Sequence, residues 1–311
     1  MSVVSFVFLY QQLVRNEQIF LCVSLKICTF AAILSATIMK FRVTVLTLLA
    51  FIVMNAAAYD FKFGNLYYTI VSKTERTVEV AYSSARHSGK VVVPAEVTHK
   101  NRKWKVIGLG VDAFYGSTQL TEVVLPASLK YIVGGAFERC SGLKHLSVPA
   151  GVTLRSYALR NSGVESLRIP RGMKWSGRYM CQLANMPQLK TIEFDEGVEF
   201  IPNGAFQFDV KLERVKLPNT IRHIGNYAFV GCLSLRSLDI PSSVQSMGHL
   251  VDYGECALQE IRVHWRDPIS IDARTFPRET YQNAVLYVPA GTKGKYRQMV
   301  GWSRFRNIEE M

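Results

Sequence analysis

Hydrophobic residues recur with a regular spacing through the middle of the chain. The segment Leu120-Thr-Glu-Val123-Val-Leu125-Pro126 has apolar residues at its first, fourth and sixth positions and ends in proline. Six further segments of this pattern begin at residues 143, 164, 189, 212, 235 and 258, at intervals of 23, 21, 25, 23, 23 and 23 residues. Side chains alternate along a strand and proline interrupts a hydrogen-bond ladder, so each segment is predicted to be a short strand with one apolar face.

A second landmark keeps the same spacing between these predicted strands. Ala-Phe pairs at 113–114, 136–137, 205–206 and 228–229 lie 23, 69 and 23 residues apart, and 69 is three periods. A unit of this size cannot bury its apolar face alone, whereas stacked units join these faces into one continuous core. The spacing therefore predicts a solenoid of parallel strands. Degenerate copies from Lys90 to Pro94 and from Leu286 to Pro289 extend it at both ends.

The repeat resembles the BspA-like, or Treponema-type, leucine-rich repeats of exported bacterial proteins. The segment Ile224-Gly-Asn-Tyr-Ala-Phe-Val-Gly-Cys232 is the best match to their Ile-Gly-x-x-Ala-Phe-x-x-Cys pattern, and the resemblance covers roughly Tyr59 to Met311. It implies a leucine-rich repeat solenoid with a parallel β-sheet on the concave face, short turns or 3-10 segments on the convex side, and a cap at each end.

The resemblance also suggests boundaries within this part of the chain. We expect an N-terminal cap with the first degenerate repeat over residues 59–116 and the regular repeats over residues 117–264. The last degenerate repeat and a C-terminal cap are expected over residues 265–311. Caps are required because the end repeats would otherwise expose the core and an unpaired sheet edge.

The first 58 residues are expected to lie outside the solenoid. Basic residues follow Met39, an apolar run extends from Val43 to Met54, and small residues precede Tyr59, so residues 39–58 are predicted to be a secretory signal peptide. The mature chain is then exported, whether it is periplasmic, displayed on the cell surface or secreted, and no stable membrane insertion of it is expected.

A signal peptide that begins at an internal methionine indicates that residues 1–38 are an upstream extension of the gene start rather than translated protein. The alternative is an uncleaved membrane anchor. Ile19 to Ile38 is a 20-residue apolar stretch with Lys26 as its single charge, which is long enough to span a bilayer.

Basic residues outnumber acidic ones. The chain has 37 Lys and Arg against 24 Asp and Glu, and without residues 1–58 it keeps 33 basic and 23 acidic residues, a net charge of +10. In a cytoplasmic protein this excess would point to nucleic acid. For an exported protein it points to anionic surfaces outside the cell, and no nucleic-acid partner is predicted.

The outward positions of the predicted strands carry charges of alternating sign. The second positions are Lys144, Glu165, Lys190, Glu213 and Arg236, and the fifth positions are Arg168, Glu193, Lys216, Asp239 and Arg262. Each charge then has opposite neighbours about one strand spacing away, which would solubilise the sheet and set its register. The outward positions from Thr121 to Arg262 contain no Trp, Tyr or Phe, so sugar stacking is not predicted there.

The functional interpretation of this surface is a protein-docking face, because solenoids commonly bind partners there. The family resemblance implies adhesion to a host matrix or microbial surface protein. The candidate partner-binding residues are Lys144, His145, Arg168, Lys190, Glu193, Arg214, Lys216, Arg236, Asp239 and Arg262, with Trp175 and Arg178. The last two belong to a repeat that lacks the Ala-Phe motif, and its basic-aromatic run is either a looser turn or a local contact patch.

The alternative function is the capture of an anionic glycan, or a structural role in the envelope, through basic residues of the caps. These residues are Lys100, Arg102, Lys103 and Lys105 at one end and Lys293, Lys295, Arg297, Arg304 and Arg306 at the other, beside Trp302. A run of this kind is usually a solvated surface.

An enzyme is the least favoured class. The sequence contains no HExxH, GxSxG, GxxxxGK[ST] or DxDxDG motif, and its histidines are scattered, so neither a cofactor, a metal nor catalysis is predicted. Cys140 and Cys232 are four periods apart, near 19 Å in a stack, and are predicted to be buried thiols. Cys232 and Cys256 are one period and one residue apart, a spacing that allows a bridge between neighbouring repeats, and Cys181 has no evident partner.

Overall fold

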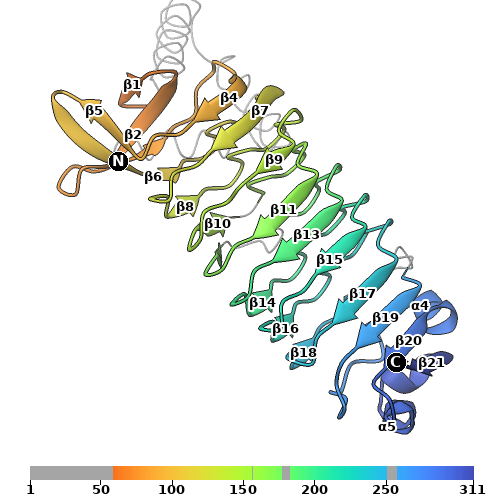
Figure 1. The fold of residues 1–311 in the computed structure, drawn as a ribbon. Helices are drawn as coiled ribbons and strands as arrows, with labels where there is room; N and C mark the ends of the chain where they lie inside the picture. Colours follow the sequence, from red (N-terminus) through yellow and green to blue (C-terminus); the bar gives the residue numbers. More distant parts are fainter. Residues whose placement is uncertain (1–58, 156, 177–182, 251–257) are drawn as a thin grey trace, which may run out of the picture. The chain divides into compact units, whose positions relative to one another are not determined.

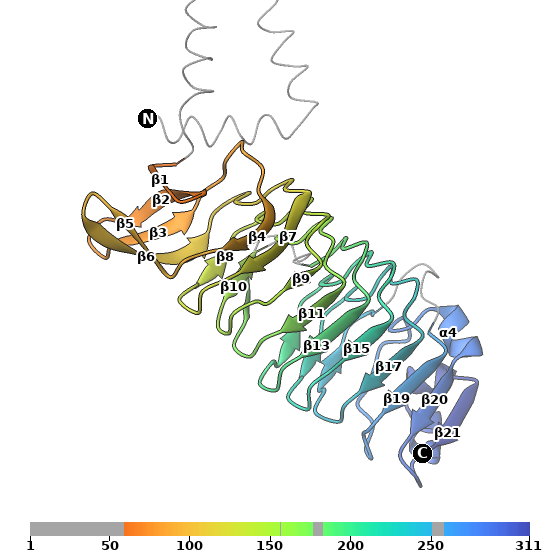
Figure 2. The same ribbon diagram turned by 45° about the horizontal axis from the view of Figure 1, so that its top comes forward.

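Successive coils of the chain stack on one another in the computed structural model, which describes residues 59–155, 157–176, 183–250 and 258–311. Each regular coil contributes one strand to a long row of parallel strands and many contribute a second, shorter strand on the opposite side (Figures 1 and 2). The predicted leucine-rich repeat solenoid is thereby confirmed.

The first row of strands carries the Leu-x-x-Val-x-Val segments. It consists of a six-stranded sheet and then a four-stranded sheet. In stack order the strands are β4 (Ser88–Val92), β7 (Gln119–Val124), β9 (His145–Leu146), β11 (Ser166–Ile169), β13 (Thr191–Phe194) and β15 (Arg214–Lys216), followed by β17 (Ser237–Ile240), β19 (Glu260–Val263), β20 (Val285–Val288) and β21 (Asn307–Glu310). Leu167 is in register with Ile192, and Ile192 with Val215, so equivalent positions of successive repeats lie side by side.

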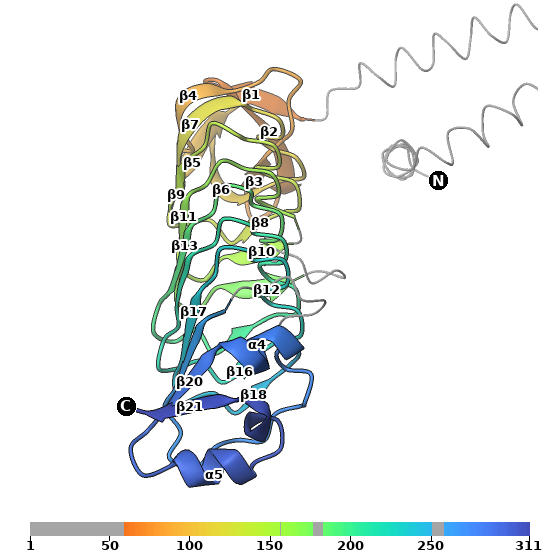
Figure 3. The same cartoon turned by 90° about the vertical axis from the view of Figure 1, so that its right-hand side faces the viewer.

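A second row of short strands lies on the other side of the coils, where the sequence predicts only turns or 3-10 segments (Figure 3). Its members are β6 (Arg102–Leu109), β8 (Tyr131–Ile132), β10 (Thr153–Arg155) and β12 (Lys174–Ser176), and, in a separate sheet, β14 (Phe200–Ile201), β16 (His223–Ile224) and β18 (Ser246–Met247). Each coil has one apolar residue here, such as Ile132, Leu154 or Ile224, that is buried. Burial of this residue aligns the backbone on either side of it with the same segment of the next coil. The aligned segments then pair as short parallel strands.

Different structures close the two ends of the core. At the N-terminal end, β1 (Phe61–Phe63), β2 (Leu66–Ser72) and β3 (Thr77–Val80) are antiparallel, and β5 (Glu96–His99) forms a hairpin with β6. At the C-terminal end are α4 (Arg278–Asn283), α5 (Lys293–Gln298) and the 3-10 turn η1 (Trp302–Arg304). Trp302 and Tyr296 are fully buried there, so aromatic side chains cover the last coils.

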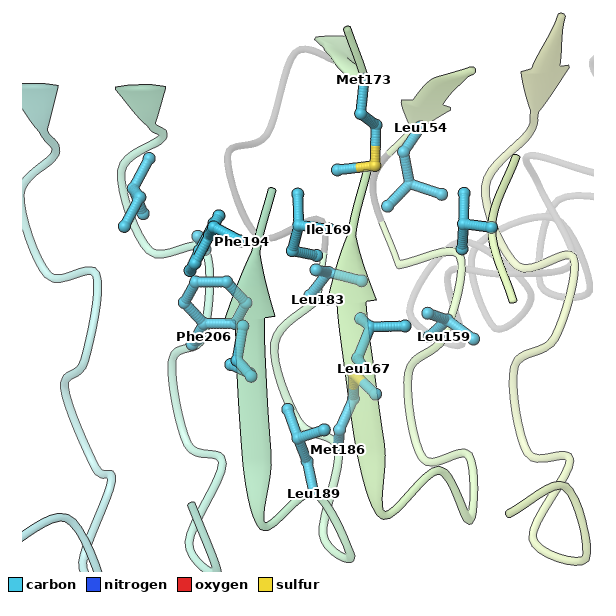
Figure 4. Close-up of a cluster of buried hydrophobic side chains, with 14 of the residues drawn as sticks. Leu154, Leu159, Leu167, Ile169, Met173, Leu183, Met186, Leu189, Phe194 and Phe206 are labelled. Carbon is cyan, nitrogen blue, oxygen red and sulfur yellow. The ribbon is translucent and has the colours of Figure 1, made fainter. Parts of the chain in front are cut away.

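The apolar positions of all coils form one core. The rings of Phe114 and Phe137, from neighbouring Ala-Phe turns, stack with centroids 5.3 Å apart, and those of Phe206 and Phe229 lie 5.8 Å apart. Figure 4 shows the middle of the core, where Leu167 and the residues around it fill the space between the two rows of strands. Burial of each such side chain contributes about 1.5–3 kcal/mol, which the polar outward positions cannot supply.

Several sequence-based predictions concern residues outside the described part of the chain. These are the signal peptide over 39–58, the upstream extension over 1–38, and the roles of Arg178, Cys181 and Cys256. None of the helices in the described ranges has the length and apolar character that a bilayer crossing requires.

Candidate functional site

The outward side chains of β7, β9, β11, β13, β15, β17 and β19 form a largely polar surface, which we name the strand face. Its alternation follows the predicted pattern. In β11, for example, Leu167 and Ile169 are buried whereas Ser166 and Arg168 are exposed. The repeat register then places the same outward position of successive coils in one line.

The second positions form an ion-pair ladder at the centre of this face. Lys144 Nζ lies 2.8 Å from one carboxylate oxygen of Glu165, and Lys190 Nζ lies 2.9 Å from the other. Hydrogen bonds from these two ammonium groups lower the pKa of Glu165 to about 2. The predicted pair of opposite neighbours is confirmed for Glu165.

The fifth positions follow the predicted ladder only in part. Lys216 Nζ lies 2.6 Å from Glu193, as predicted. Arg168, however, hydrogen-bonds Asp195. Asp239 Oδ1 lies 2.6 Å from His264 Nε2.

These differences arise from the position that ends each strand unit. Most units end in proline, but Asp195 and His264 take its place in two of them. Both side chains place polar atoms beside the residues at the fifth positions. They therefore bind charged groups that would otherwise pair with each other along the stack. At the last regular coil, Arg262 instead bonds Glu260 of its own strand at 2.8 Å and lies 5.2 Å from the centroid of the Tyr287 ring.

A groove interrupts the strand face between β15 and β17. The two strands are neighbours in the stack (Figure 1), yet they belong to different sheets, whereas successive strands on either side pair with one another. The groove encloses about 460 Å³. It is lined by Val215, Lys216, Leu217, Asn219, Asp239, Pro241, Ser242 and His264.

The interruption changes what this part of the face presents to solvent. Val215 and Leu217 pack against the core but are only partly buried, whereas the matching Leu238 and Ile240 of β17 are fully buried. Apolar atoms are therefore accessible beside the charged groups of the groove. A concave site that combines apolar atoms with a few polar groups is suited to receive a side chain from a partner.

The structure brings only some of the predicted binding residues to this groove. Lys216 and Asp239 line it, and Glu193 is bonded to Lys216. Arg214 and Arg236 are exposed on the adjacent strand face. Farther along the stack, His145 is exposed and in register with Glu122 and Ser166.

Of the eight groove residues, only Lys216 and Asp239 were predicted binding candidates, and the polar residues Asn219, Ser242 and His264 were not. A signal for His264 was available, since it departs from the proline that ends most strand units. Nothing in the repeat marks the sheet boundary between β15 and β17, because both strands keep the regular pattern.

Trp175 is partly buried and packs against the core. It is in register with Leu154, a buried residue. The ring therefore fills the inward position of β12. Arg178, another predicted member of the contact patch, lies outside the described residues.

The basic residues of the caps are partly paired with acids. Lys103 lies 3.9 Å from Glu96, and Lys295 hydrogen-bonds Asp267. Trp302, which was considered an aromatic neighbour of the C-terminal cluster, is fully buried and unavailable to a ligand. In the described ranges, no three His, Cys, Asp or Glu side chains gather as a metal site would require.

Comparisons with known proteins agree with this architecture. The family described as BspA type leucine rich repeat region matches six copies over residues 105–208 and 180–283. No curated protein matches the chain.

The chain is also similar to solved leucine-rich repeat proteins. One from Bacteroides ovatus is 19% identical, covers 81% of this chain and 77% of its own, and has a TM-score of 0.38. The Treponema pallidum protein is 18% identical, with 56% and 91% coverage and a TM-score of 0.43. A leucine rich cell surface protein of Faecalibacterium prausnitzii is 15% identical, with 80% and 94% coverage and a TM-score of 0.28. The matched repeats span more than half of the chain, which therefore belongs to the BspA-type leucine-rich repeat family.

Proposed function

We propose that this protein binds another protein through its strand face, with the groove between β15 and β17 at the centre of the contact. Leucine-rich repeat proteins typically bind proteins and generally serve as non-enzymatic scaffolds. The observation that carries the proposal is the boundary between the two sheets at β15 and β17, where Val215 and Leu217 are partly exposed beside Lys216 and Asp239.

The chemistry of the groove defines the partner. An apolar side chain would cover Val215 and Leu217, an acidic group beside it would meet Lys216, and a basic group would meet Asp239. Because charges of both signs line the face, the partner surface is mixed in sign and is not a polyanion. Such complementarity mainly sets the association rate and the orientation.

We further propose that the protein is exported and that the contact serves adhesion to a host matrix or microbial surface protein. The predicted signal peptide over 39–58 supports export, and the Faecalibacterium prausnitzii relative is described as a cell surface protein. Mass spectrometry of the protein from its native host tests this, with a mature N-terminus at Tyr59 as the expected result. A peptide from residues 1–38 would contradict the internal start.

A binding comparison of charge reversals tests the docking face. Matrix and envelope proteins are captured with the protein, and the affinity of each captured protein is measured by surface plasmon resonance for Lys216→Glu, Asp239→Lys and the control Arg297→Glu in the C-terminal cap. We expect each groove variant to bind about tenfold more weakly and the control to be unchanged. Equal losses, or loss with the control alone, would favour binding through the caps.

A further inference from the structure

Arginine and tyrosine side chains alternate along the turn side of the first coils. We name this surface the arginine–tyrosine edge. Its members are Tyr82, Arg86, Tyr115, Arg139, Tyr157 and Arg160. The first two come from the segment after β3, and the others come from the turns that contain the Ala-Phe pairs or their equivalent. The three arginines are exposed and the three tyrosines are half-buried.

Direct contacts hold this edge in order. The guanidinium carbon of Arg86 lies 5.7 Å from the ring centroids of both Tyr82 and Tyr115, and that of Arg139 lies 5.8 Å from the Tyr115 ring. Arg86 Nη1 also donates a hydrogen bond of 2.7 Å to the carbonyl oxygen of Tyr115. Stacking on an aromatic ring restricts a guanidinium while its outer N–H groups remain available to an anion.

The next coil continues the edge. The guanidinium carbon of Arg160 lies 5.3 Å from the Tyr157 ring centroid, and Arg160 Nη1 is 4.0 Å from Glu138. The Arg160 side chain is 45% exposed, whereas that of Glu138 is only 13% exposed. The carboxylate of Asp112 lies against Gly135, where it leaves no room for a Cβ atom. Glu138 is therefore sheltered, whereas the three arginines of the edge are exposed.

We infer that the arginine–tyrosine edge binds an anionic polysaccharide. Arg86 and Arg139 lie against the same Tyr115 ring, and Arg160 lies in the next coil, about 4.8 Å farther along the stack, so the guanidinium groups are spread along it. Such an arrangement fits a linear polymer with repeated sulfate or carboxylate groups, which arginine binds with two parallel hydrogen bonds. The half-buried tyrosine rings offer apolar surface to the sugar rings, which an acidic peptide would not use.

This inference is independent of the proposed protein-docking face. The edge lies on the turns, whereas the strand face lies on the first row of strands. It also differs from the cap hypothesis, because Arg139 and Arg160 belong to repeats and carry a structured contact with tyrosine. A variant of one surface therefore leaves the other intact.

Two triple variants with equal loss of charge test the inference. Arg86→Gln/Arg139→Gln/Arg160→Gln changes the edge, and Lys100→Gln/Arg102→Gln/Lys103→Gln changes the exposed β5–β6 hairpin. Binding of the full chain to heparin, a sulfated polymer, and to polygalacturonate, a carboxylated one, is measured by titration calorimetry near 0.15 M salt. We expect the edge variant to bind at least one of them about tenfold more weakly and the hairpin variant to change less than twofold.

Further variants and ligands test whether binding requires the arginine side chains themselves or only their positive charge. Arg86→Lys/Arg139→Lys/Arg160→Lys keeps the charge but loses the planar donors, so we expect a loss of affinity of about threefold or more. Equal losses in the two glutamine variants would overturn the inference, as would no polysaccharide binding by the unchanged protein. Equal affinity for poly-glutamate or single-stranded DNA would also overturn it. Circular dichroism melting curves establish that each variant is folded.

Discussion

Cys140 and Asp209 occupy the same position in coils three repeats apart, and they hydrogen-bond in different ways. The Cys140 thiol donates to the carbonyl oxygen of Phe114 at 3.0 Å, and Cys232, also at this position, donates to Phe206 at 3.2 Å. Asp209 Oδ1 instead accepts a hydrogen bond of 2.7 Å from the Met186 amide, and its Oδ2 is buried without a partner among the described residues. One coil thus holds a carboxyl group where two others hold a thiol.

Burial raises the pKa of Asp209 well above its ordinary value of 3.8. A raised folded-state pKa contributes stability that is fully present below the unfolded value and is lost as pH rises through the folded value. Replacement of Asp209 by Asn keeps an acceptor for the Met186 amide and removes the ionisation. We therefore expect Asp209→Asn to gain roughly 1 to 3 kcal/mol at pH 8 and little at pH 3, measured by urea unfolding across this range.

A second variant separates charge from hydrogen bonding at this position. Asp209→Cys places a thiol donor where Cys140 and Cys232 have theirs, and it should remove the same pH dependence. An unchanged pH dependence in both variants would mean that another group causes it.

The strand face predicts a pH effect of the opposite sign. Hydrogen bonds from Lys144 and Lys190 lower the pKa of Glu165 to about 2. A lowered pKa contributes stability above the unfolded value and loses it as pH falls through the folded value. We expect carbon NMR titration of the Glu165 carboxyl group to have a midpoint near 2. In the double variant Lys144→Ala/Lys190→Ala, the midpoint should move up toward the ordinary value of 4.5.

Repetition made most of this fold predictable from the sequence. Leu120, Leu143 and the equivalent leucines of the later repeats identify the strands. Each begins a segment whose apolar face can be buried only when the repeats stack on one another. The same regularity explains the prediction of opposite charges around Glu165. Nothing comparable distinguishes Trp175, where an aromatic residue beside basic ones suggests a contact patch but the coil register turns the ring inward.

The sequence did not predict the structural features that depend on differences between neighbouring coils. The groove depends on the separation of β15 from β17, and each strand taken alone follows the repeat pattern. The arginine–tyrosine edge depends on Arg86, from a cap segment, reaching Tyr115. Such contacts depend on where side chains lie in three dimensions, and the repeat period of the sequence does not give those positions.

The thiol of Cys140 should be chemically inert in the folded protein. The side chain is buried, and burial raises its pKa to about 12, so almost no thiolate is present at neutral pH. We expect iodoacetamide to label Cys140 only after unfolding, as followed by peptide mass spectrometry. The same unfolded sample, prepared without reductant, tests the bridge between Cys232 and Cys256, because labelling of both thiols would exclude it.

The turn that holds Asp209 offers a matched pair of phenylalanines for a test of core packing. Phe206 is fully buried and stacks on Phe229, whereas Phe208, two residues later, is 44% exposed. We expect Phe206→Ala to lower the free energy of unfolding by about 3–5 kcal/mol through lost burial and a cavity. Phe208→Ala should lower it by less, because much of the Phe208 ring already lies in solvent.

Phe206→Leu should cost less than Phe206→Ala, since Leu159 fills the equivalent position in another coil. Because each coil contacts mainly its neighbours, the loss should be local. Hydrogen exchange should speed up most in β13, β15 and the Ala-Phe turns beside them, and least in β4 and β20. Uniform acceleration along the stack would indicate instead that the solenoid unfolds as one cooperative unit.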